Sequence, residues 1–273
     1  MDDKIANQLI ELTGAFNQVG LKPLICGGLG VYLTFFGRET EVPIRTTNDI
    51  DLMLTENQIA HREIVANIVT DRLHYTVLEH GRHFQFQKGE QRLDILTQPV
   101  EGIPINGFRA KLVKSKLHGY CTPEAAFIHE DLITVPLSQV WPGTNMAIGI
   151  EVSVPSLTNQ LILKLFAFND RHEGQRKNDG QARAHAYDIY VIITLATIND
   201  YKQGQKFLAR HSDSEVIRKA KSIVSTKFSS VEQPGWQHVL ATSSFHPNLN
   251  IPQKRNRLDK TKRRIVRWFT IPA

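Results

Sequence analysis

The residues best suited to chemistry are two aspartates, Asp49 and Asp51, in the stretch RTTNDID at positions 45–51. Residues i and i+2 of a β-strand point to the same face of a sheet, so the two carboxylates would lie side by side. A further aspartate, Asp94, stands in a second apolar run, RLDIL at 92–96. Grouped carboxylates bind hard cations, and the pattern predicts a Mg²⁺ site formed by Asp49, Asp51 and Asp94. Such a site is typical of phosphoryl and nucleotidyl transfer.

The aspartate pair has a second interpretation, because a solvent-facing strand edge or a loop cap can also carry two carboxylates. The apolar alternation of Ile50, Leu52 and Leu54 favours a strand whose other face is packed on a core. Neighbouring carboxylates raise each other's pKa unless a cation is present. A group of three therefore indicates a bound positive charge.

A glycine pair, Gly27-Gly28, follows a short apolar run at 22–26. Glycines at such a turn let backbone N–H groups approach a phosphate, and the N-terminus of a following helix attracts an anion. The pair lacks the Gly-Lys-Ser/Thr of a Walker A loop and the spacing of a dinucleotide fingerprint. A purely geometric role for the turn is the alternative.

Two charged residues interrupt apolar helical stretches in the second half of the chain, Lys164 within 161–168 and Asp188 within 186–191. A buried lysine is costly unless it is paired or faces a cleft. One interpretation is a Lys164–Asp188 salt bridge that joins two helices. In the other, Lys164 and Arg171 contact triphosphate oxygens, while Asp188 orients them or acts as a base.

Hydrophobic periodicity predicts the elements that must position these residues. In the N-terminal half we expect helices at 3–18, 29–36 and 56–73, and strands at 22–26, 49–54, 75–78, 84–87 and 93–96. A turn at 88–90 would bring Asp94 beside the strand of Asp49 and Asp51. Residues 98–153 have an irregular, β-rich pattern. After Pro155 we expect helices at 156–170, 182–198, 200–210 and 213–226, with a polar linker at 171–181.

Length and composition bound the protein class. With 273 residues and 41% hydrophobic residues, the chain can bury the core of one large or two modest domains. We expect a boundary between 1–153 and 154–273, with an α/β first part and a helical second part. The two cysteines, Cys26 and Cys121, lack CxxC spacing and indicate a reducing compartment. The acidic N-terminus and the lack of a long apolar run predict a cytoplasmic protein without a membrane span.

The net charge of +6 is concentrated near the C-terminus. Eight basic residues stand between positions 254 and 267 against one acid, Asp259: Lys254, Arg255, Arg257, Lys260, Lys262, Arg263, Arg264 and Arg267. One interpretation is contact with RNA or another polyanion. The other is a solvated helix face anchored by Ile265, Val266, Trp268 and Phe269.

Taken together, these motifs resemble the nucleotidyltransferase superfamily, and specifically the abortive-infection, AbiEii-type, nucleotidyltransferase toxins. The family pattern is matched in order along residues 25–195. The matching residues are Gly27, Gly28, Arg45, Thr47, Asp49, Asp51, Asp94, Pro155, Lys164, Ala167, Arg171 and Asp188. The family's Lys/Arg-Asp pair is displaced here, because Lys177 and Asp179 lie nine or more residues before Asp188.

The resemblance implies an α+β fold, with a nucleotidyltransferase-like mixed β-sheet core with helices and a mainly helical C-terminal domain that completes the nucleotide cleft. It implies a nucleoside triphosphate substrate and one or two Mg²⁺ ions on Asp49, Asp51 and Asp94. Gly27, Gly28, Arg45, Thr47, Lys164 and Arg171 would bind the nucleotide, and Lys164 and Asp188 would join the carboxylates in catalysis. The acceptor would be RNA, such as a tRNA end, or a protein, and the chain would be a toxin with an antitoxin partner.

Two rival functions use the same residues. A small-molecule nucleotidyltransferase of the antibiotic-modifying kind would share the metal site and would show an acidic cleft for a cationic acceptor. A non-catalytic protein that binds nucleic acid or a partner would keep the fold without needing Asp49.

Overall fold

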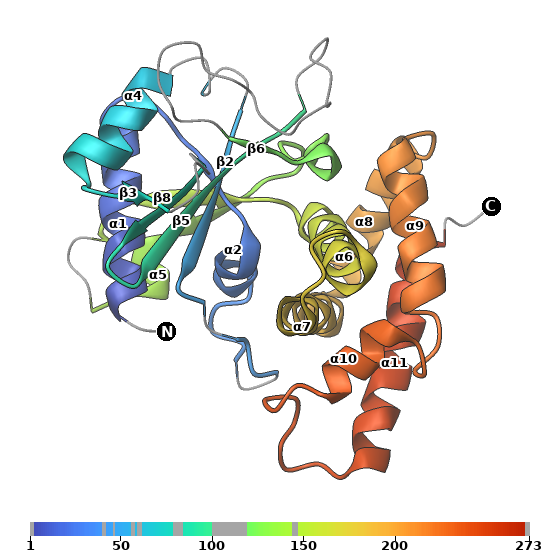
Figure 1. Cartoon of the computed structure of the whole chain (residues 1–273). Coiled ribbons are helices and arrows are strands. Elements are labelled where there is room, and N and C mark those ends of the chain that lie inside the picture. Colours follow the sequence, from blue (N-terminus) through green and yellow to red (C-terminus); the bar gives the residue numbers. More distant parts are fainter. Residues whose placement is uncertain are drawn as a thin grey trace. The chain divides into compact units, whose positions relative to one another are not determined.

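An eight-stranded mixed β-sheet forms the centre of the N-terminal part of the chain in the computed structural model (Figure 1). The structure describes residues 3–39, 42–45, 47–55, 58, 62–78, 84–99, 119–143 and 147–270. The strand order is β3-β4-β5-β2-β1-β8-β7, and β6 also pairs with β5. The strands are β1 (Leu24–Ile25), β2 (Asp49–Leu54), β3 (Thr76–Val77), β4 (Gln85–Lys88), β5 (Gln91–Thr97), β6 (Tyr120–Cys121), β7 (Ile133–Pro136) and β8 (Glu151–Val154).

The chain divides into two compact units. Unit 1 comprises Met1–Phe36 and Thr46–Ser156, and unit 2 comprises Gly37–Arg45 and Leu157–Ala273. The sequence places its boundary between 153 and 154 and assigns residues 37–45 to the N-terminal domain. In the structure this short segment belongs to the helical unit instead, for reasons that its hydrogen bonds explain below.

The two strands that carry the aspartates, β2 and β5, are parallel neighbours, and β2 pairs antiparallel with β1 on its other side. Strand β2 pairs in parallel with β5 from Asp49↔Arg92 to Leu54↔Thr97. Ile50, Leu52, Leu93 and Ile95 are 0% exposed, so one face of this strand pair is entirely core. Alternation then directs the residues between them, including the aspartates, to the other face.

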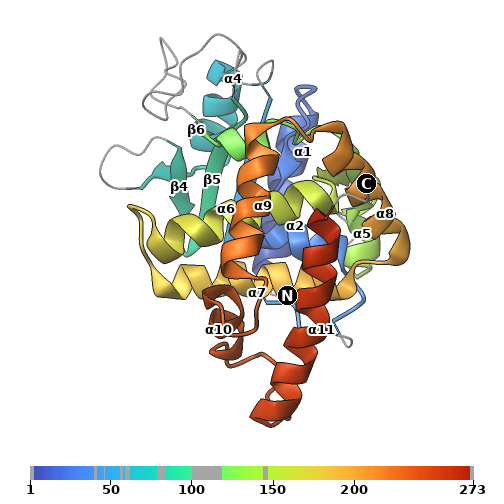
Figure 2. The ribbon, with the colours of Figure 1, turned by 90° about the vertical axis from the view of Figure 1, so that its right-hand side faces the viewer.

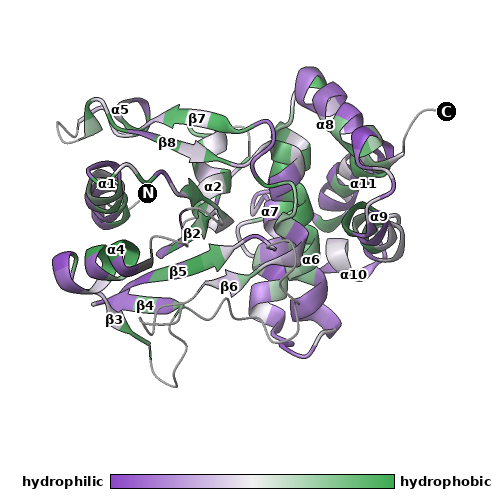
Figure 3. Ribbon diagram, turned by 90° about the horizontal axis from the view of Figure 1, so that it is seen from above, coloured by the Kyte–Doolittle hydropathy of each residue, from purple (hydrophilic) through white to green (hydrophobic). Residues whose placement is uncertain are grey.

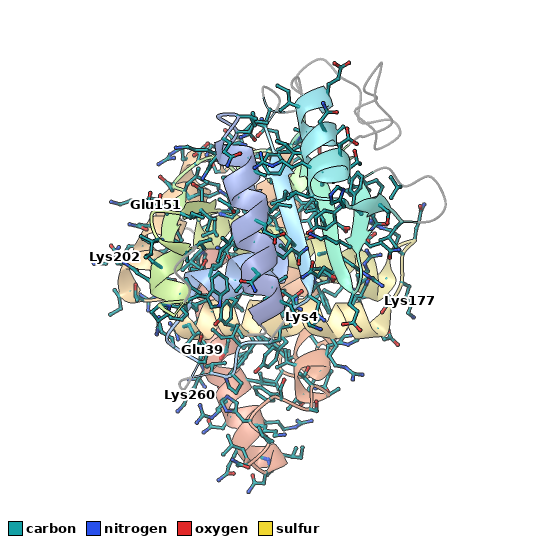
Figure 4. All side chains as sticks on the ribbon, turned by 90° about the vertical axis from the view of Figure 1, so that its left-hand side faces the viewer. Lys4, Glu39, Glu151, Lys177, Lys202 and Lys260 are labelled. Atoms are coloured by element: carbon teal, nitrogen blue, oxygen red, sulfur yellow. The ribbon has the colours of Figure 1, made fainter. Side chains whose placement is uncertain are left out.

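Helices cover both faces of the sheet in unit 1. Helix α1 (Asp3–Asn17) and helix α4 (Arg62–Ala66), which continues as a π-helical turn (Asn67–Arg72), lie on one side. Helix α2 (Gly27–Thr34) lies on the other side (Figure 1). Helix α1 begins near Lys4 (Figure 4) and contacts the β4–β5 hairpin, where Lys88 Nζ lies 3.3 Å from Glu11 Oε2. The carboxylate-bearing face is therefore the face that α1 does not cover.

Unit 2 consists mainly of helices. They are α6 (Leu157–Glu173), α7 (Asp179–Leu195), α8 (Ile198–Arg210), α9 (Glu215–Lys227), α10 (Pro234–Leu240) and α11 (Ile251–Phe269), as Figure 2 shows. Hydrophobic faces of α6 and α7 form the core, and the outer turns of α8 and α11 are hydrophilic (Figure 3). Side-chain caps begin several helices: Asn178 caps α7, and Thr197 and Asn250 begin α8 and α11 with capping boxes.

The predicted elements agree with the structure in kind and differ at their ends. The predicted bounds of the strand at 49–54 are those of β2. The predicted linker at 171–181 is wrong for most of its length, because α6 continues to Glu173 and the Asn178 cap starts α7 at Asp179. Within 98–153, residues 100–118 and 144–146 lie outside the described residues, and the rest contains β6, β7, β8 and the short helix α5 (Leu137–Val140).

The α+β fold class, with a mixed sheet followed by a helical region, is confirmed.

A further finding concerns membranes. Within the described part of the chain, we find no helix with both the length and the apolar character that crossing a bilayer requires.

Glycine packing provides a test of the helical unit. A Cβ at Gly204 on α8 would lie 2.3 Å from Nε1 of Trp268, which is 1% exposed on α11. We expect Gly204→Ala to lower the free energy of unfolding by about 1–3 kcal/mol, because the indole has little room to move. The control is Gly14→Ala on α1, where a Cβ meets nothing within 4 Å. Urea unfolding followed by circular dichroism should show Gly14→Ala unchanged or more stable by about 0.5–1 kcal/mol. Equal stability of both variants would contradict this packing.

Candidate active site

The sheet brings the three predicted carboxylates onto one face of two neighbouring strands. Asp51 on β2 is directly opposite Asp94 on β5, and Asp49 is opposite Arg92. Residues paired across parallel strands point to the same side of a sheet, so the carboxylates of Asp51 and Asp94 are neighbours. Asp49 is exposed, whereas Asp51 and Asp94 are partly buried. The predicted convergence of Asp94 on the Asp49/Asp51 strand is thus what the strand register shows.

Two polar side chains support this row of carboxylates. Gln85 on β4 is opposite Asp94, and its Nε2 donates to Asp94 Oδ1 and Oδ2 at 3.3 and 3.1 Å. The hydroxyl of Thr47 accepts a hydrogen bond from the backbone N–H of Asp49 at 3.2 Å. Gln85 therefore orients Asp94, and Thr47 shapes the turn that leads into β2. Gln85 was not predicted as a site residue, although its place in the hairpin with Asp94 was a usable signal.

Crowding changes the acidity of Asp94. Burial, together with the neighbouring carboxylates of Asp51 and Asp49, raises the pKa of Asp94 to about 7, against the opposing effects of Gln85 and Arg92. A carboxyl with this pKa exchanges its proton near neutral pH, as a general base must. A cation bound among the three carboxylates would relieve the same repulsion.

Gly27 is the one position of the turn where glycine is required. Its φ is +65°, and a Cβ there would lie 1.6 Å from Oδ2 of Asp51. The backbone N–H of Cys26 also donates to the backbone oxygen of Asp51 at 2.8 Å. The start of α2, which includes the buried Gly28, is therefore held against the Asp51 carboxylate. A helix N-terminus at this point stabilises nearby negative charge.

The donor set fits a hard cation. Asp49, Asp51 and Asp94 supply only oxygen atoms, and Mg²⁺ is usually held by one or two protein carboxylates with water and phosphate oxygens completing its shell. Among the described residues, however, no three His, Cys, Asp or Glu side chains are gathered closely enough to hold a metal ion. A metal site with all three aspartates as ligands thus stays a prediction. The strand register places the three residues on one face of the sheet, from which they could reach the same cation.

A second charged cluster lies within unit 2. Lys164 Nζ lies 2.6 Å from Asp188 Oδ2, and Arg45 donates to both oxygens of Asp188 at 2.7 and 2.8 Å. The side chains of Lys164 and Asp188 are 5% and 2% exposed, and that of Arg45 is 26% exposed. This is the salt bridge that the sequence allowed as the alternative to triphosphate contact, extended by an arginine. The trio, which we call the Asp188 triad, carries one net positive charge.

The triad keeps Asp188 ionised. Burial would raise the pKa of Asp188, but the charges and hydrogen bonds of Lys164 and Arg45 outweigh burial and lower it to about 2. A carboxylate this acidic is a poor proton acceptor, so its contacts favour the orienting role over the predicted role as a base. The neighbouring His185 is neutral, because burial lowers its pKa to about 3 and the charge of Lys164 acts in the same direction.

Hydrogen bonds explain why Gly37–Arg45 belongs to unit 2. Besides Arg45, Arg38 donates to the backbone oxygen of Leu195 at 2.5 Å, at the C-terminal end of α7. The hydroxyl of Tyr187 donates to the backbone oxygen of Pro43 at 2.7 Å. The segment therefore hydrogen-bonds to α7 both near the middle of the helix and at its C-terminal end. Arg45 was predicted to bind the nucleotide, and the hydrogen bonds of this segment to α7 were not predicted.

Arg171, the other predicted phosphate ligand of this unit, lies in the last turn of α6. Its Nη1 donates to the backbone oxygen of Arg176 at 3.2 Å and lies 3.8 Å from Asp170 Oδ2. Its guanidinium helps to order the loop between α6 and α7, where Lys177 lies on the outside (Figure 4). Contact between Arg171 and a nucleotide stays a prediction.

The basic C-terminal segment is the helix α11, and its charges have local partners. Lys254 and Arg267 lie over the rings of Phe245 and Tyr201, Arg255 pairs with Glu232, Lys262 and Arg263 pair with Asp259, and Arg264 donates to the backbone oxygens of Thr194 and Ala196. Ile265, Trp268 and Phe269 are buried as predicted, whereas Val266 is 37% exposed. Six of the eight cations therefore serve the helical unit itself, which favours the solvated-helix interpretation.

Comparisons with known proteins add a distant structural likeness. The solution structure of the antibiotic-resistance factor ANT(2'')-Ia aligns with 78% of this chain and 99% of that chain, at 14% identity and a TM-score of 0.41. A scan against protein-family models and a search of curated proteins found no match. Because a likeness this low does not establish a shared function, the site is interpreted from its own residues.

The crowding at Asp94 predicts a pH-dependent stability. Its pKa is 3.8 in the unfolded chain and about 7 in the folded protein. Its contribution to stability is therefore fully present at pH values below 3.8 and is lost as the pH rises through about 7. We expect Asp94→Asn to match the wild type at low pH and to exceed it at pH ~8 by on the order of 1–3 kcal/mol, in EDTA. Urea unfolding at the two pH values measures this, and a pH-independent difference would contradict it.

The Asp188 triad predicts a large effect of one charge. Asp188→Asn leaves Lys164 and Arg45 without their buried carboxylate. We expect it to lower the free energy of unfolding by about 3–5 kcal/mol. The matched control is Asp170→Asn on α6, whose side chain is 30% exposed in its pair with Arg176. That variant should lower the free energy of unfolding by less than about 1 kcal/mol, because solvent-accessible ion pairs contribute little to stability. Thermal unfolding of both variants is the measurement, and similar losses would show that the triad does not stabilise unit 2.

Proposed function

We propose that this protein is a Mg²⁺-dependent nucleotidyltransferase that transfers a nucleoside monophosphate from a nucleoside triphosphate to an acceptor hydroxyl. The observation that carries this proposal is the carboxylate row, in which Asp51 is opposite Asp94, Asp49 shares their face, and Gly27 closes on Asp51. Crowded carboxylates that carry oxygen donors only are suited to a hard cation and to a phosphate-bearing substrate.

Asp49 and Asp51 are the proposed Mg²⁺ ligands, and Asp94 completes the site. When bound, Mg²⁺ would stabilise the negative charge that develops on the phosphate oxygens during transfer. The backbone of Gly27 and Gly28 is proposed to contact the triphosphate, where the N-terminus of α2 favours an anion. Thr47, in the turn that precedes β2, is proposed to contact the triphosphate as well.

Asp94 is proposed to accept the proton of the acceptor hydroxyl. Burial and the neighbouring carboxylates raise the pKa of Asp94 to about 7 in the metal-free protein, and a cation bound beside it would lower that pKa and favour the ionised carboxylate that can take the proton. The acceptor oxygen then forms a bond to the α-phosphorus. The bond between the α-phosphorus and its bridging oxygen breaks, and pyrophosphate leaves with the electron pair. Gln85 keeps Asp94 oriented through both carboxylate oxygens.

The Asp188 triad of unit 2 is proposed to bind an anionic group of a nucleotide. Arg45 is the most exposed member of the Asp188 triad, and the triad's net positive charge favours an anion at its guanidinium. Lys164 and Asp188 would act by holding Arg45, since each is almost fully buried in the triad. Arg171 is proposed as a further cation for the nucleotide.

The finer parts of the proposal follow from the resemblance to AbiEii-type toxins. The acceptor would be RNA, such as a tRNA end, or a protein, and the biological role would be that of a cytoplasmic toxin held in check by an antitoxin. These parts rest on analogy between sequences, whereas the chemistry rests on the carboxylate row.

Transfer of label tests the proposal. We expect wild-type protein, incubated with each α-³²P-labelled nucleoside triphosphate, Mg²⁺ and total RNA or protein, to label one acceptor fraction. Asp51→Asn and Asp49→Asn should lower the rate by at least about 100-fold, because each removes negative charge that holds the cation. EDTA should abolish labelling.

The control is Asp71→Asn, which changes an exposed aspartate of unit 1 whose Oδ1 accepts from Thr70. That variant should label at the wild-type rate. Labelling that is equal in wild type and Asp51→Asn, or that occurs in neither, would overturn the catalytic proposal and leave a protein that binds without reacting.

A further inference from the structure

Two histidines from different helices contact each other within unit 2. Nε2 of His238, on α10, lies 3.3 Å from Nδ1 of His172, which is in the last turn of α6. The ring centroids are 5.3 Å apart, and the planes of the rings meet at 84°. Helix α10 packs mainly on α7 (Figure 2), so this contact is a polar connection from α10 to α6.

A buried aromatic ring holds the two histidines in this position. Phe168, which is 0% exposed, stacks on His172 at 5.4 Å with an angle of 8° between the rings, and it lies edge-to-face with His238 at 5.6 Å. Phe168 in turn packs against Phe228 at 5.0 Å. Both histidines are partly exposed, so protons reach them from solvent. The pair is therefore fixed by its surroundings and can still titrate.

The charged groups around the pair come from every helix that packs against it. On α7, Asp179 raises the pKa of His238 and Arg183 lowers it, whereas burial and the proximity of His172 lower it more strongly overall. Three further acids have cationic partners of their own: Asp170 with Arg171 and Arg176, Glu173 of α6 with Lys227 of α9, and Glu232, which precedes α10, with Arg255 of α11. The net result is a pKa of His238 below its ordinary value.

The number of protons on the pair decides whether the contact can form. When both rings are neutral, an N–H of one ring donates to the lone pair of the other. A first added proton gives an imidazolium that donates to a neutral imidazole, which is a stronger, charge-assisted hydrogen bond. A second proton places an N–H on both facing nitrogens, so that neither can accept and the two charges repel. The contact is therefore compatible with one added proton and incompatible with two.

We propose that the contact between His172 and His238 is a pH-sensitive latch, which connects α10 to α6 and opens when both imidazoles are protonated. The pKa of His238 is lowered from 6.5 in the folded protein. Its contribution to stability is therefore present above pH 6.5 and is lost as the pH falls from there through the folded-state pKa. The latch does not rest on the proposed reaction, because neither histidine belongs to the carboxylate row or to the Asp188 triad.

Opening of the latch affects one end of α10 more than the other. Near its start, Trp236 is 0% exposed, and its Nε1 donates to the backbone oxygen of Phe228 at 2.8 Å. These contacts contain no group that titrates near neutral pH. His238 lies in the last turn of the helix. Acidification therefore loosens the end of α10 while its start stays packed.

Titration of the histidine rings tests the coupling between them. In NMR spectra of protein labelled with ¹³C-histidine, we expect His172 and His238 to titrate in two steps separated by more than about one pH unit, as strongly interacting sites do. In His172→Gln, His238 should titrate in a single step at a higher pH, because the effect of its neighbour is gone. A titration of His238 that is the same with and without His172 would overturn the latch.

Hydrogen exchange tests whether protonation opens the contact. The exchange rates of α10 amides, divided by those of unstructured peptides at the same pH, are compared at pH ~7.5 and pH ~5 by mass spectrometry. We expect the protection of α10 in the wild type to fall by at least about tenfold, the effect of one unit of pKa shift. His238→Gln and His172→Gln should keep their protection at both pH values, because a glutamine amide can donate or accept and does not titrate.

The matched control is His211→Gln, which removes a histidine at the end of α8 whose ring lies 4.9 Å from that of Phe207. It should lose α10 protection on acidification as the wild type does, while α8 itself stays protected in every protein. Loss that is confined to proteins with both His172 and His238 supports the latch. No loss in the wild type, or equal loss in the glutamine variants, overturns it. If one glutamine variant lacks α10 protection already at the higher pH, the other variant and the titration decide.

Discussion

The structure depends most on one constraint, which is that two carboxylates stand directly opposite each other on adjacent parallel strands. Asp51 and Asp94 repel, and the sheet register holds them together regardless. The apolar residues on the opposite face, such as Ile50 and Leu93, fix that register because a shift by one residue would turn them outward. Burial of the core thus supplies the free energy that keeps like charges side by side.

The surroundings of the two carboxylates moderate this repulsion without removing it. Gln85 donates to Asp94, Arg92 adds positive charge nearby, and Gly27 leaves space for the carboxylate of Asp51. Asp94 still has a raised pKa. Sites that retain unrelieved charge of this kind are often functional, because the missing counter-charge is supplied by a ligand. In unit 2 the opposite arrangement occurs, since Asp188 lies between two cations and one positive charge remains.

Local patterns in the sequence predicted the elements well, since alternation and capping act over a few residues. Strand β2 was predicted with its observed bounds because Ile50, Leu52 and Leu54 recur at every second position after Asp49. The turn at Gly89 correctly predicted that Asp94 would return to the sheet beside that strand. The linker between α6 and α7 was predicted to be too long, because the polar residues around Gly174 favour a loop. In the structure α6 continues to Glu173, and α7 begins at Asp179 directly after its N-cap, Asn178.

Interactions between distant residues left no periodic signal and were missed. Nothing near Arg38 or Arg45 in the sequence indicates that they bond to α7, more than 140 residues away. The same applies to Arg264, which was counted toward RNA contact and instead donates to the carbonyl groups that end α7. Basic residues are ambiguous in a sequence, because a guanidinium can bind a phosphate, a carboxylate or a helix terminus with the same donors.

The placement of Gly37–Arg45 has a consequence for how the chain acquires its structure. Because this segment bonds to α7 while its flanks belong to unit 1, neither unit corresponds to one continuous stretch of polypeptide. During synthesis the segment leaves the ribosome well before α7, so Arg38, Pro43 and Arg45 must wait for their partners. A fragment that ended at Ser156 would keep the segment without α7. A fragment that began at Leu157 would bury Lys164 and Asp188 without the arginine that shares their charge.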